Sequence, residues 1–315
     1  MHNLLQGRSS SPLSARDKKI YLETNREAAR GLLIIARRWQ PDFVVIHDQQ
    51  MAPAAWSVPD GIRTILRLHL DLSQPDKSAL NFLRPYFERF DLLIVTNKAY
   101  RPVWFPAARA KEVAPAIDPL SEKNKIMSYA GAARELLSRN VHVDRPLISQ
   151  VSRFDPWKDP LGVIRAYYIA KNKIPELQLV LAGEYAADDP EGYRLFAEVK
   201  KHARGDPDIF LFNDHDDFFI SALQTASDVI LQKSLREGFG LTVTEAMWRG
   251  KVVIGGRTTG IAMQIKNGES GFLVSSPEEA ASAIVKILRN PGLARKIGRA
   301  ARLTVKEKFL FPEFM

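Results

Sequence analysis

Ten short runs of β-branched and other apolar residues alternate along the chain with longer amphipathic stretches. The short runs predict strands at 42–48, 62–71, 91–97, 111–118, 146–155, 177–185, 208–214, 228–234, 251–256 and 271–276. The amphipathic stretches predict helices in most of the gaps, notably at 15–38, 160–173, 191–203, 241–249 and 277–289. This alternation is typical of β-α units built around parallel sheets. We therefore predict an α/β fold.

The stretch 117–144 separates the four strands predicted before it from the six predicted after it. Its opening Ile-Asp-Pro favours an extended turn before a helix. We predict a first domain at 1–118, a linker and connecting helix at 119–144, and a second domain at 145–315. Because the first group has fewer strands and opens with a helix, we expect the first domain to lack its beginning. A small complete domain is the alternative.

Composition narrows the functional classes. The chain has 315 residues, enough for two domains, with 45% hydrophobic and 26% charged residues, as in ordinary globular proteins. No apolar run has the length of a membrane span, and the start lacks the apolar core of a signal peptide, so we expect a cytoplasmic protein without a membrane partner. The absence of cysteine excludes disulfides, thiolate nucleophiles and zinc–cysteine sites.

The net charge of +9 raises the question of a nucleic-acid partner. The basic residues are scattered, and their short groups have helical spacing among acidic or apolar neighbours. That pattern favours solvated helix faces. We therefore expect no nucleic acid, and a smaller anion such as a sugar-nucleotide diphosphate would need only a few of these cations.

The segment 234–255 carries the most informative pattern. A strand is predicted to end near Ser234, a Gly-Phe-Gly loop follows, and a helix begins near Leu241. In an open α/β sheet, ligands bind beyond the carboxyl ends of the strands, and the N–H groups of a helix start suit a phosphate. Glu237 and Glu245 can both face this crevice, Glu245 accepting from a ribose and Glu237 from a hexose. Such a pair alone is more often structural, but the glycine loop favours a site.

A second segment, 149–167, places two cations at the same edge. Arg153 and Lys158 flank the turn between the first strand of the second domain and its first helix. Arginine binds a diphosphate through two parallel hydrogen bonds, and lysine adds a mobile point charge. Alone, such a pair is more often surface decoration. Beside a helix start that accepts phosphate, it predicts a clamp for a leaving diphosphate.

In the first domain, polar pairs end two of the predicted strands. His47 and Asp48 end one strand, and His69 and Asp71 end the next. A histidine at a strand end is as often a hydrogen-bonding loop residue as a functional one. Two equivalent pairs favour contacts with an acceptor sugar.

Several segments resemble a known family. The donor domain of glycosyltransferase family four is similar to VSRFDPWKD, LAGEYAADDPEGY, SDVILQKSLREGFGLTVTEAMWRGK and NGESGFLV. The trehalose-forming members of that family are similar also in HNLLQG, VVIHDQQ, LRLHLDLSQP and IDPLSEKN, so the resemblance covers nearly the whole chain. It implies the GT-B fold, in which two Rossmann-like domains face each other across a cleft.

The resemblance also implies an activity and a set of roles. The reaction would transfer glucose from a nucleoside diphosphate glucose to glucose, giving trehalose with the α configuration retained and without a metal or other cofactor. The catalytic residues would be Glu237 on the donor sugar with Arg153 and Lys158 on the diphosphate. The donor site would further contain Gly238, Phe239, Gly240 and Leu241 at the phosphate, Glu245 at the ribose, and Thr242. The expected partners are sugar and nucleotide-sugar substrates, and a homodimer is left open.

Two departures from the family pattern accompany the resemblance. Gln49 stands where the trehalose-forming members have proline, and the chain is expected to be shorter than they are at both ends, with Met1 resembling an internal methionine. The open alternatives are a retaining trehalose phosphorylase, another hexosyltransferase of this fold, or an inactive remnant that binds sugar nucleotides. A nicotinamide oxidoreductase is disfavoured, because no G-x-G-x-x-G follows a predicted strand with an acidic residue about 20 positions on.

Overall fold

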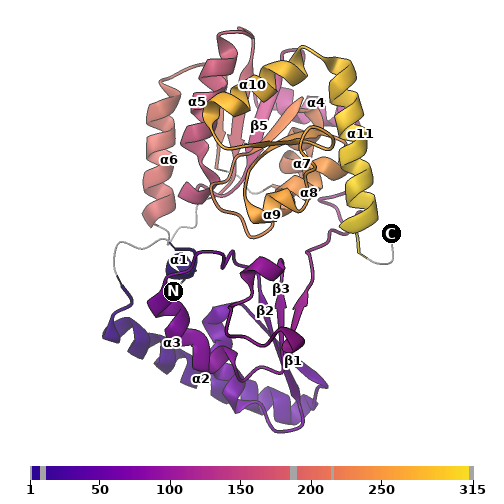
Figure 1. Cartoon of the computed structure of the whole chain (residues 1–315). Coiled ribbons are helices and arrows are strands. Elements are labelled where there is room, and N and C mark those ends of the chain that lie inside the picture. Colours follow the sequence, from indigo (N-terminus) through magenta and orange to yellow (C-terminus); the bar gives the residue numbers. More distant parts are fainter. Residues whose placement is uncertain (1, 8–11, 185–189, 214–215, 312–315) are drawn as a thin grey trace. The chain divides into compact units, whose positions relative to one another are not determined.

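The computed structural model describes residues 2–7, 12–184, 190–213 and 216–311. The chain divides into two compact units, Met1–Ala114 and Pro115–Met315. Each unit contains one parallel sheet with helices packed against it (Figure 1). The predicted α/β class is confirmed.

The first unit has a four-stranded sheet in the order β1-β2-β3-β4. Its strands are β1 Phe43–His47, β2 Arg63–Leu68, β3 Leu92–Val95 and β4 Ala110–Glu112, and its helices are α1 His2–Leu5, α2 Ala15–Trp39 and α3 Lys77–Phe87. Helix α2 begins with a capping box, in which the Ser14 hydroxyl and the Asp17 carboxylate bond reciprocally to backbone N–H groups. A 3-10 helix, Gln49–Ser57, follows β1 and packs on α2.

The second unit has a six-stranded sheet in the order β10-β9-β8-β5-β6-β7. Its strands are β5 Leu147–Val151, β6 Gln178–Ala182, β7 Ile209–Phe212, β8 Val229–Gln232, β9 Val252–Gly256 and β10 Phe272–Val274. Its helices are α4 Tyr129–Ser138, α5 Pro160–Lys171, α6 Pro190–Ala203, α7 Asp217–Ala226, α8 Leu241–Trp248, α9 Thr259–Ala262, α10 Pro277–Leu288 and α11 Pro291–Lys308. The strand order reverses between β5 and β8, which is where open α/β sheets hold ligands.

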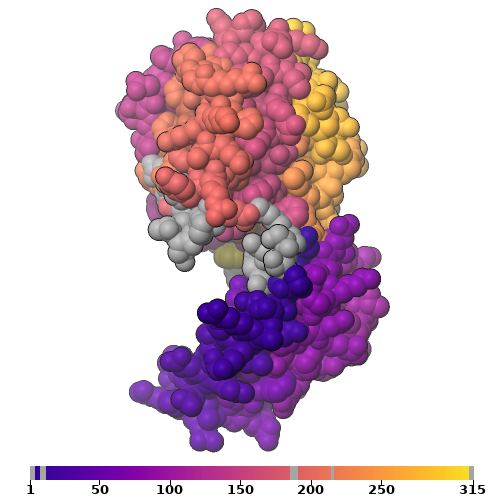
Figure 2. Space-filling model, turned by 90° about the vertical axis from the view of Figure 1, so that its left-hand side faces the viewer, coloured from indigo at the N-terminus to yellow at the C-terminus, as the bar shows by residue number. Residues whose placement is uncertain are grey.

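Helices cover both faces of this second sheet. Helix α6 packs Leu195 and Val199 into the core, and its outer face lies on the side of the molecule seen in Figure 2. Helices α4 and α7 pack on the other side, where Leu136, Phe219 and Leu223 are buried. Among the described residues, no helix is both long and apolar enough to cross a membrane.

All ten predicted strands form, but several are shorter than predicted. The fourth, predicted at 111–118, ends at Glu112. Pro115 has no N–H to donate to a ladder, and Ile117 pairs instead with Leu310 near the end of the chain. The strand ends are thus limited by backbone hydrogen bonding.

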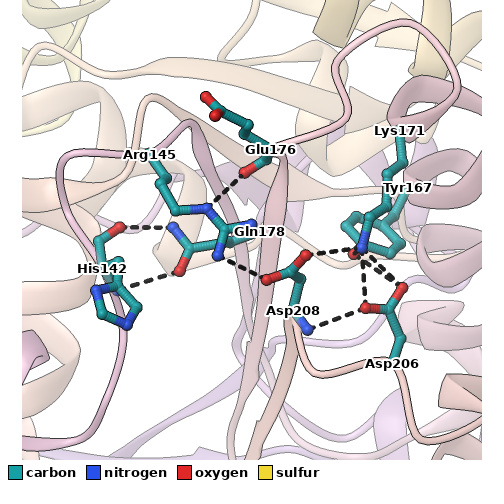
Figure 3. Close-up of polar contacts among 8 residues, drawn as sticks. All are labelled: His142, Arg145, Tyr167, Lys171, Glu176, Gln178, Asp206 and Asp208. Atoms are coloured by element: carbon teal, nitrogen blue, oxygen red, sulfur yellow. Dashed lines mark hydrogen bonds and ion pairs between the residues drawn. The ribbon is translucent and has the colours of Figure 1, made fainter.

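Side chains at the amino ends of β5, β6 and β7 form a polar network and a separate Gln178–His142 pair (Figure 3). Arg145 Nη1 lies 2.7 Å from Asp208 Oδ1, and Lys171 Nζ lies 2.9 Å from both Asp206 Oδ1 and Asp208 Oδ2. The Gln178 side-chain amide donates to the His142 carbonyl at 2.5 Å and accepts from the His142 backbone N–H at 3.1 Å. This network ties the strand starts together, at the opposite edge of the sheet from the predicted site.

Candidate functional site

The loop between β8 and α8 is held at the carboxyl end of the sheet by close backbone contacts. The Leu235 N–H donates to the Trp157 carbonyl at 2.8 Å, which joins the loop to the turn after β5. A Cβ on Gly256 would lie 2.0 Å from the Ser234 carbonyl oxygen, and one on Gly260 would lie 2.6 Å from the Gly238 backbone. Glycine is therefore required at both positions for the loop to approach so closely.

Glu237 is a buried carboxylate paired with a cation. Lys158 Nζ lies 2.6 Å from Glu237 Oε2, and the Ser234 hydroxyl donates to the same oxygen at 3.1 Å. Gln232 supports this arrangement by donating to Ser234 Oγ at 3.1 Å. The Lys158 side chain is 18% exposed and that of Glu237 is 10% exposed. The pair is thus partly withdrawn from water. Its charges therefore act more strongly on a ligand than they would in bulk solvent.

Helix α8 begins at Leu241 without a side-chain cap. Gly240 precedes it in the left-handed conformation, at φ 86°, which favours glycine. Phe239 is buried and packs edge-on against Phe309, and Gln264 Nε2 donates to the Phe239 carbonyl at 2.6 Å. The loop is therefore fixed in front of a helix start whose dipole favours a phosphate.

Glu245 lies one turn into α8 and is almost fully buried. Its Oε1 pairs with Lys123 Nζ at 2.9 Å, and its side chain is 4% exposed. Its Oε2 is buried and has no hydrogen-bond partner. A buried acceptor without a partner is uncommon in a folded protein and calls for a reason.

Arg153 is not joined to this cluster. Its side chain is 64% exposed and lies 3.6 Å from Asp155. Lys158 is fixed more firmly, because Gln150 Nε2 donates to its carbonyl at 2.7 Å and the next residue, Asp159, pairs with buried Lys233. The structure thus brings Lys158 to Glu237, whereas Arg153 points into solvent at the same turn.

Three of the four residues predicted in the first unit lie together. His47 Nδ1 and His69 Nε2 are 2.8 Å apart with stacked rings, and Asp48 Oδ1 accepts from the backbone N–H of His69 at 2.7 Å. Burial lowers the pKa of His69, so its neutral form dominates at neutral pH. Asp71 accepts from the Ser73 N–H at 2.9 Å within its own loop.

Sequence reasoning missed several residues of the second-unit site. Ser234 and Gln232 contact Glu237, Gln264 fixes the glycine loop, and Lys123 pairs with Glu245. Lys123, Gln232 and Ser234 stood in segments already marked by the family resemblance, whereas Gln264 did not. Within the described ranges, no three histidine, aspartate or glutamate residues form a group that could hold a metal ion, and metal independence stays a prediction.

Two family models match the chain. Residues 134–304 match "Glycosyl transferases group 1", and residues 1–102 match "Trehalose synthase, N-terminal domain". The trehalose synthase of Rubrobacter xylanophilus is 41% identical over 320 residues, covering 100% of this chain and 76% of that protein. That of Pyrococcus horikoshii is 39% identical over 317 residues, covering 100% and 75%. The trehalose phosphorylase of Pleurotus pulmonarius is 27% identical, covering 98% and 48%.

Solved structures share the fold. A sucrose-phosphate synthase from Thermosynechococcus elongatus has a TM-score of 0.78 at 22% identity, covering 97% of this chain and 79% of that one. The trehalose-6-phosphate synthase OtsA has a TM-score of 0.78 at 18% identity, covering 97% and 77%. Anabaena HepE, in complex with UDP-glucose, has a TM-score of 0.77 at 20% identity, covering 90% and 78%. These likenesses confirm the predicted two-domain fold class.

Proposed function

The chain belongs to the group 1 glycosyl transferases, as a trehalose-related member, and from that premise we propose that it transfers glucose from a nucleoside diphosphate glucose to glucose. The product would be trehalose, with the α configuration of the donor retained. The observation that carries the proposal is the Lys158–Glu237 pair, set beside the start of α8 and buried Glu245 in one unit.

The second unit offers a complementary group for each part of such a donor. The start of α8 and Lys158 suit the diphosphate, Glu237 suits a hexose hydroxyl, and the unpaired Oε2 of Glu245 suits a ribose hydroxyl. Exposed Arg153 is free of the buried cluster, so it can fold over the diphosphate after entry. The UDP-glucose bound in the HepE structure belongs to that protein and supports the same donor class here.

The chemistry follows from where charge develops. As the bond between glucose C1 and the diphosphate oxygen breaks, negative charge grows on the diphosphate and positive charge on C1. Lys158 and the dipole of α8 stabilise the negative charge on the diphosphate, and the Glu237 carboxylate stabilises the positive charge on C1. The acceptor hydroxyl adds to C1, and its proton passes to the leaving diphosphate. His47 and His69 are the proposed contacts of the acceptor.

A second candidate is phosphorolysis of trehalose. It is favoured by the relative named trehalose phosphorylase and by the fact that the same cations would suit a free phosphate. Incubation with UDP-glucose or ADP-glucose plus glucose, followed by chromatography for trehalose, tests the main proposal. Parallel incubations of the protein with trehalose plus phosphate, and with maltose alone, test the alternative reactions. Nucleotide binding without any product would instead favour the inactive remnant, and absence of binding to a folded sample would overturn the donor site.

The two glutamates should respond differently to substitution. We expect Glu245→Ala mainly to raise the KM for the donor, because ribose contacts contribute similarly to the ground and transition states. Glu237→Ala should also lower kcat, by about 10²-fold or more, because its contact strengthens as charge develops. Steady-state kinetics decide between these effects, with exposed Glu198→Ala on α6 as control. Equal losses of kcat with unchanged KM would contradict the assigned roles.

A further inference from the structure

The turn that opens the second unit brings a lysine to the proposed ribose site. Lys123 Nζ lies 2.9 Å from Glu245 Oε1, although the two residues are far apart in sequence. The Lys123 side chain is 35% exposed, so it spans from solvent to a carboxylate that is 4% exposed. The lysine therefore pairs with one oxygen of Glu245, whereas the other oxygen, Oε2, is buried without a partner.

The position of Lys123 is set by its own turn. The Asn124 side chain donates to the Asp118 carbonyl and to the Ser121 hydroxyl, both at 3.0 Å. The Lys125 N–H donates to the Ser121 carbonyl at 2.9 Å. Asn124 is buried. These bonds close the turn on itself, so Lys123 is presented from a fixed backbone.

Arg249 fastens this turn to helix α8. Its guanidinium donates to the carbonyl of Glu245 at 3.0 Å, to the Ser221 hydroxyl at 3.0 Å and to the carbonyl of Lys123. Burial lowers the pKa of Arg249, while the Glu245 carboxylate opposes that shift. One guanidinium thus holds the backbones of both members of the Lys123–Glu245 pair in register.

We propose that Lys123 is a positioning residue of the nucleotide site, which holds the Glu245 carboxylate so that Oε2 faces a ribose hydroxyl. This inference rests on the proposed function. A carboxylate accepts through two oxygens, and its buried charge is stable when a cation occupies one of them. The unpartnered Oε2 then supplies the acceptor that a ribose hydroxyl completes. Without the lysine, the carboxylate is free to rotate, so Oε2 no longer faces the ribose hydroxyl.

The test compares UDP with 2′-deoxy-UDP by isothermal titration in Lys123→Met and in the unaltered chain. The unaltered chain should prefer UDP by about tenfold, the size expected for one hydrogen bond to a charged group. In Lys123→Met this preference should fall to about two- to threefold, and Lys123→Arg should restore most of it. The ratio of two affinities in one sample is insensitive to the fraction of folded protein.

Lys125→Met is the matched control. Lys125 lies in the same turn and carries the same charge, but it pairs with Glu122 at the surface. Its preference for UDP should equal that of the unaltered chain. An unchanged or larger preference in Lys123→Met would overturn the inference while leaving the proposed function intact. Absence of UDP binding by the unaltered chain would overturn the proposed function itself, and the inference with it.

Discussion

Single buried polar groups show where this molecule departs from ordinary packing. Glu237 and Glu245 are both buried, and each is paired with a lysine from a distant turn. Gln49 is fully buried as well, yet neither atom of its side-chain amide has a hydrogen-bond partner. The glutamates carry proposed roles in binding, whereas no described contact compensates the Gln49 amide.

We therefore expect Gln49→Met to stabilise the first unit. Methionine has a similar length and flexibility, and it removes the cost of an unsatisfied buried amide, about 1–3 kcal/mol. The free energy of unfolding, measured in urea, should rise by an amount in this range. Gln50→Met is the control, because the neighbouring side chain is exposed. A loss of stability in Gln49→Met would mean that the amide has a partner in solution.

At the scale of elements, short pieces of backbone position the site. Helix α9 is only four residues long, and its Gly260 lies directly under the β8–α8 loop. Gly240 gives the loop its left-handed turn into α8. The geometry of the donor site thus depends on backbone approaches that a single methyl group can disturb.

Gly260→Ala tests that dependence. The new Cβ would lie 2.6 Å from the Glu237 carbonyl oxygen, so backbone must move. We expect a loss of about 1–3 kcal/mol in stability, as for other overpacked sites, together with weaker UDP binding. Gly292→Ala at the start of α11 is the control, because nothing lies within 4 Å of its Cβ. Equal behaviour of the two variants in calorimetry would contradict the close approach.

The network at the amino ends of β5 to β7 should make the second unit sensitive to acid (Figure 3). The hydrogen bond from Arg145 lowers the pKa of Asp208. Burial alone would raise the pKa of Asp206, but hydrogen bonds, chiefly from Lys171, outweigh it and lower that pKa. Folding therefore favours the ionised carboxylates. Their contribution is present above the unfolded pKa of about 4 and is lost as pH falls through the lower folded values.

Thermal unfolding between pH 6 and pH 3 checks this expectation. The unaltered chain should lose more of its melting temperature over this range than Asp208→Asn, which has already lost one of the two carboxylates. Glu269→Gln, which removes a carboxylate that is 61% exposed, should behave like the unaltered chain. Parallel pH profiles for all three would show that the network does not respond to acid.

At the scale of the whole molecule, each unit has its own hydrophobic core. The core of the first unit gathers around Leu66, Phe87 and Leu93. That of the second occupies both faces of its sheet, with Tyr167 on one face and Phe219 on the other. Units with separate cores can unfold separately.

Calorimetry of the whole chain should therefore give two transitions, and UDP should raise only one of them. The proposed nucleotide contacts lie within the second unit, so binding stabilises that unit by about 2.7 kcal/mol at a hundredfold excess over Kd. Glu245→Ala should reduce the shift at the same UDP concentration. One transition that moves as a whole would show that the units unfold together, and a shift of both transitions would show that UDP also stabilises the first unit.

The sequence alone determined the class of fold and the main residues of the candidate site. Strands buried on both faces leave apolar runs, and the glycine loop before α8 marks a helix start, so local pattern was sufficient for both. The roles of the site residues stay predictions. The family resemblance, rather than periodicity, supplied the trehalose-related assignment.

Only the tertiary structure decided which charges meet. Nothing in local sequence indicates that Lys123 pairs with Glu245 or that Lys158 pairs with Glu237, because each pair joins segments that are far apart in the chain and that only the fold brings together. Nor does it indicate that Arg153 stays in solvent, or that the fourth strand ends at Glu112. Pairing of side chains depends on distances across the fold, whereas the period of a strand or helix depends only on its own backbone.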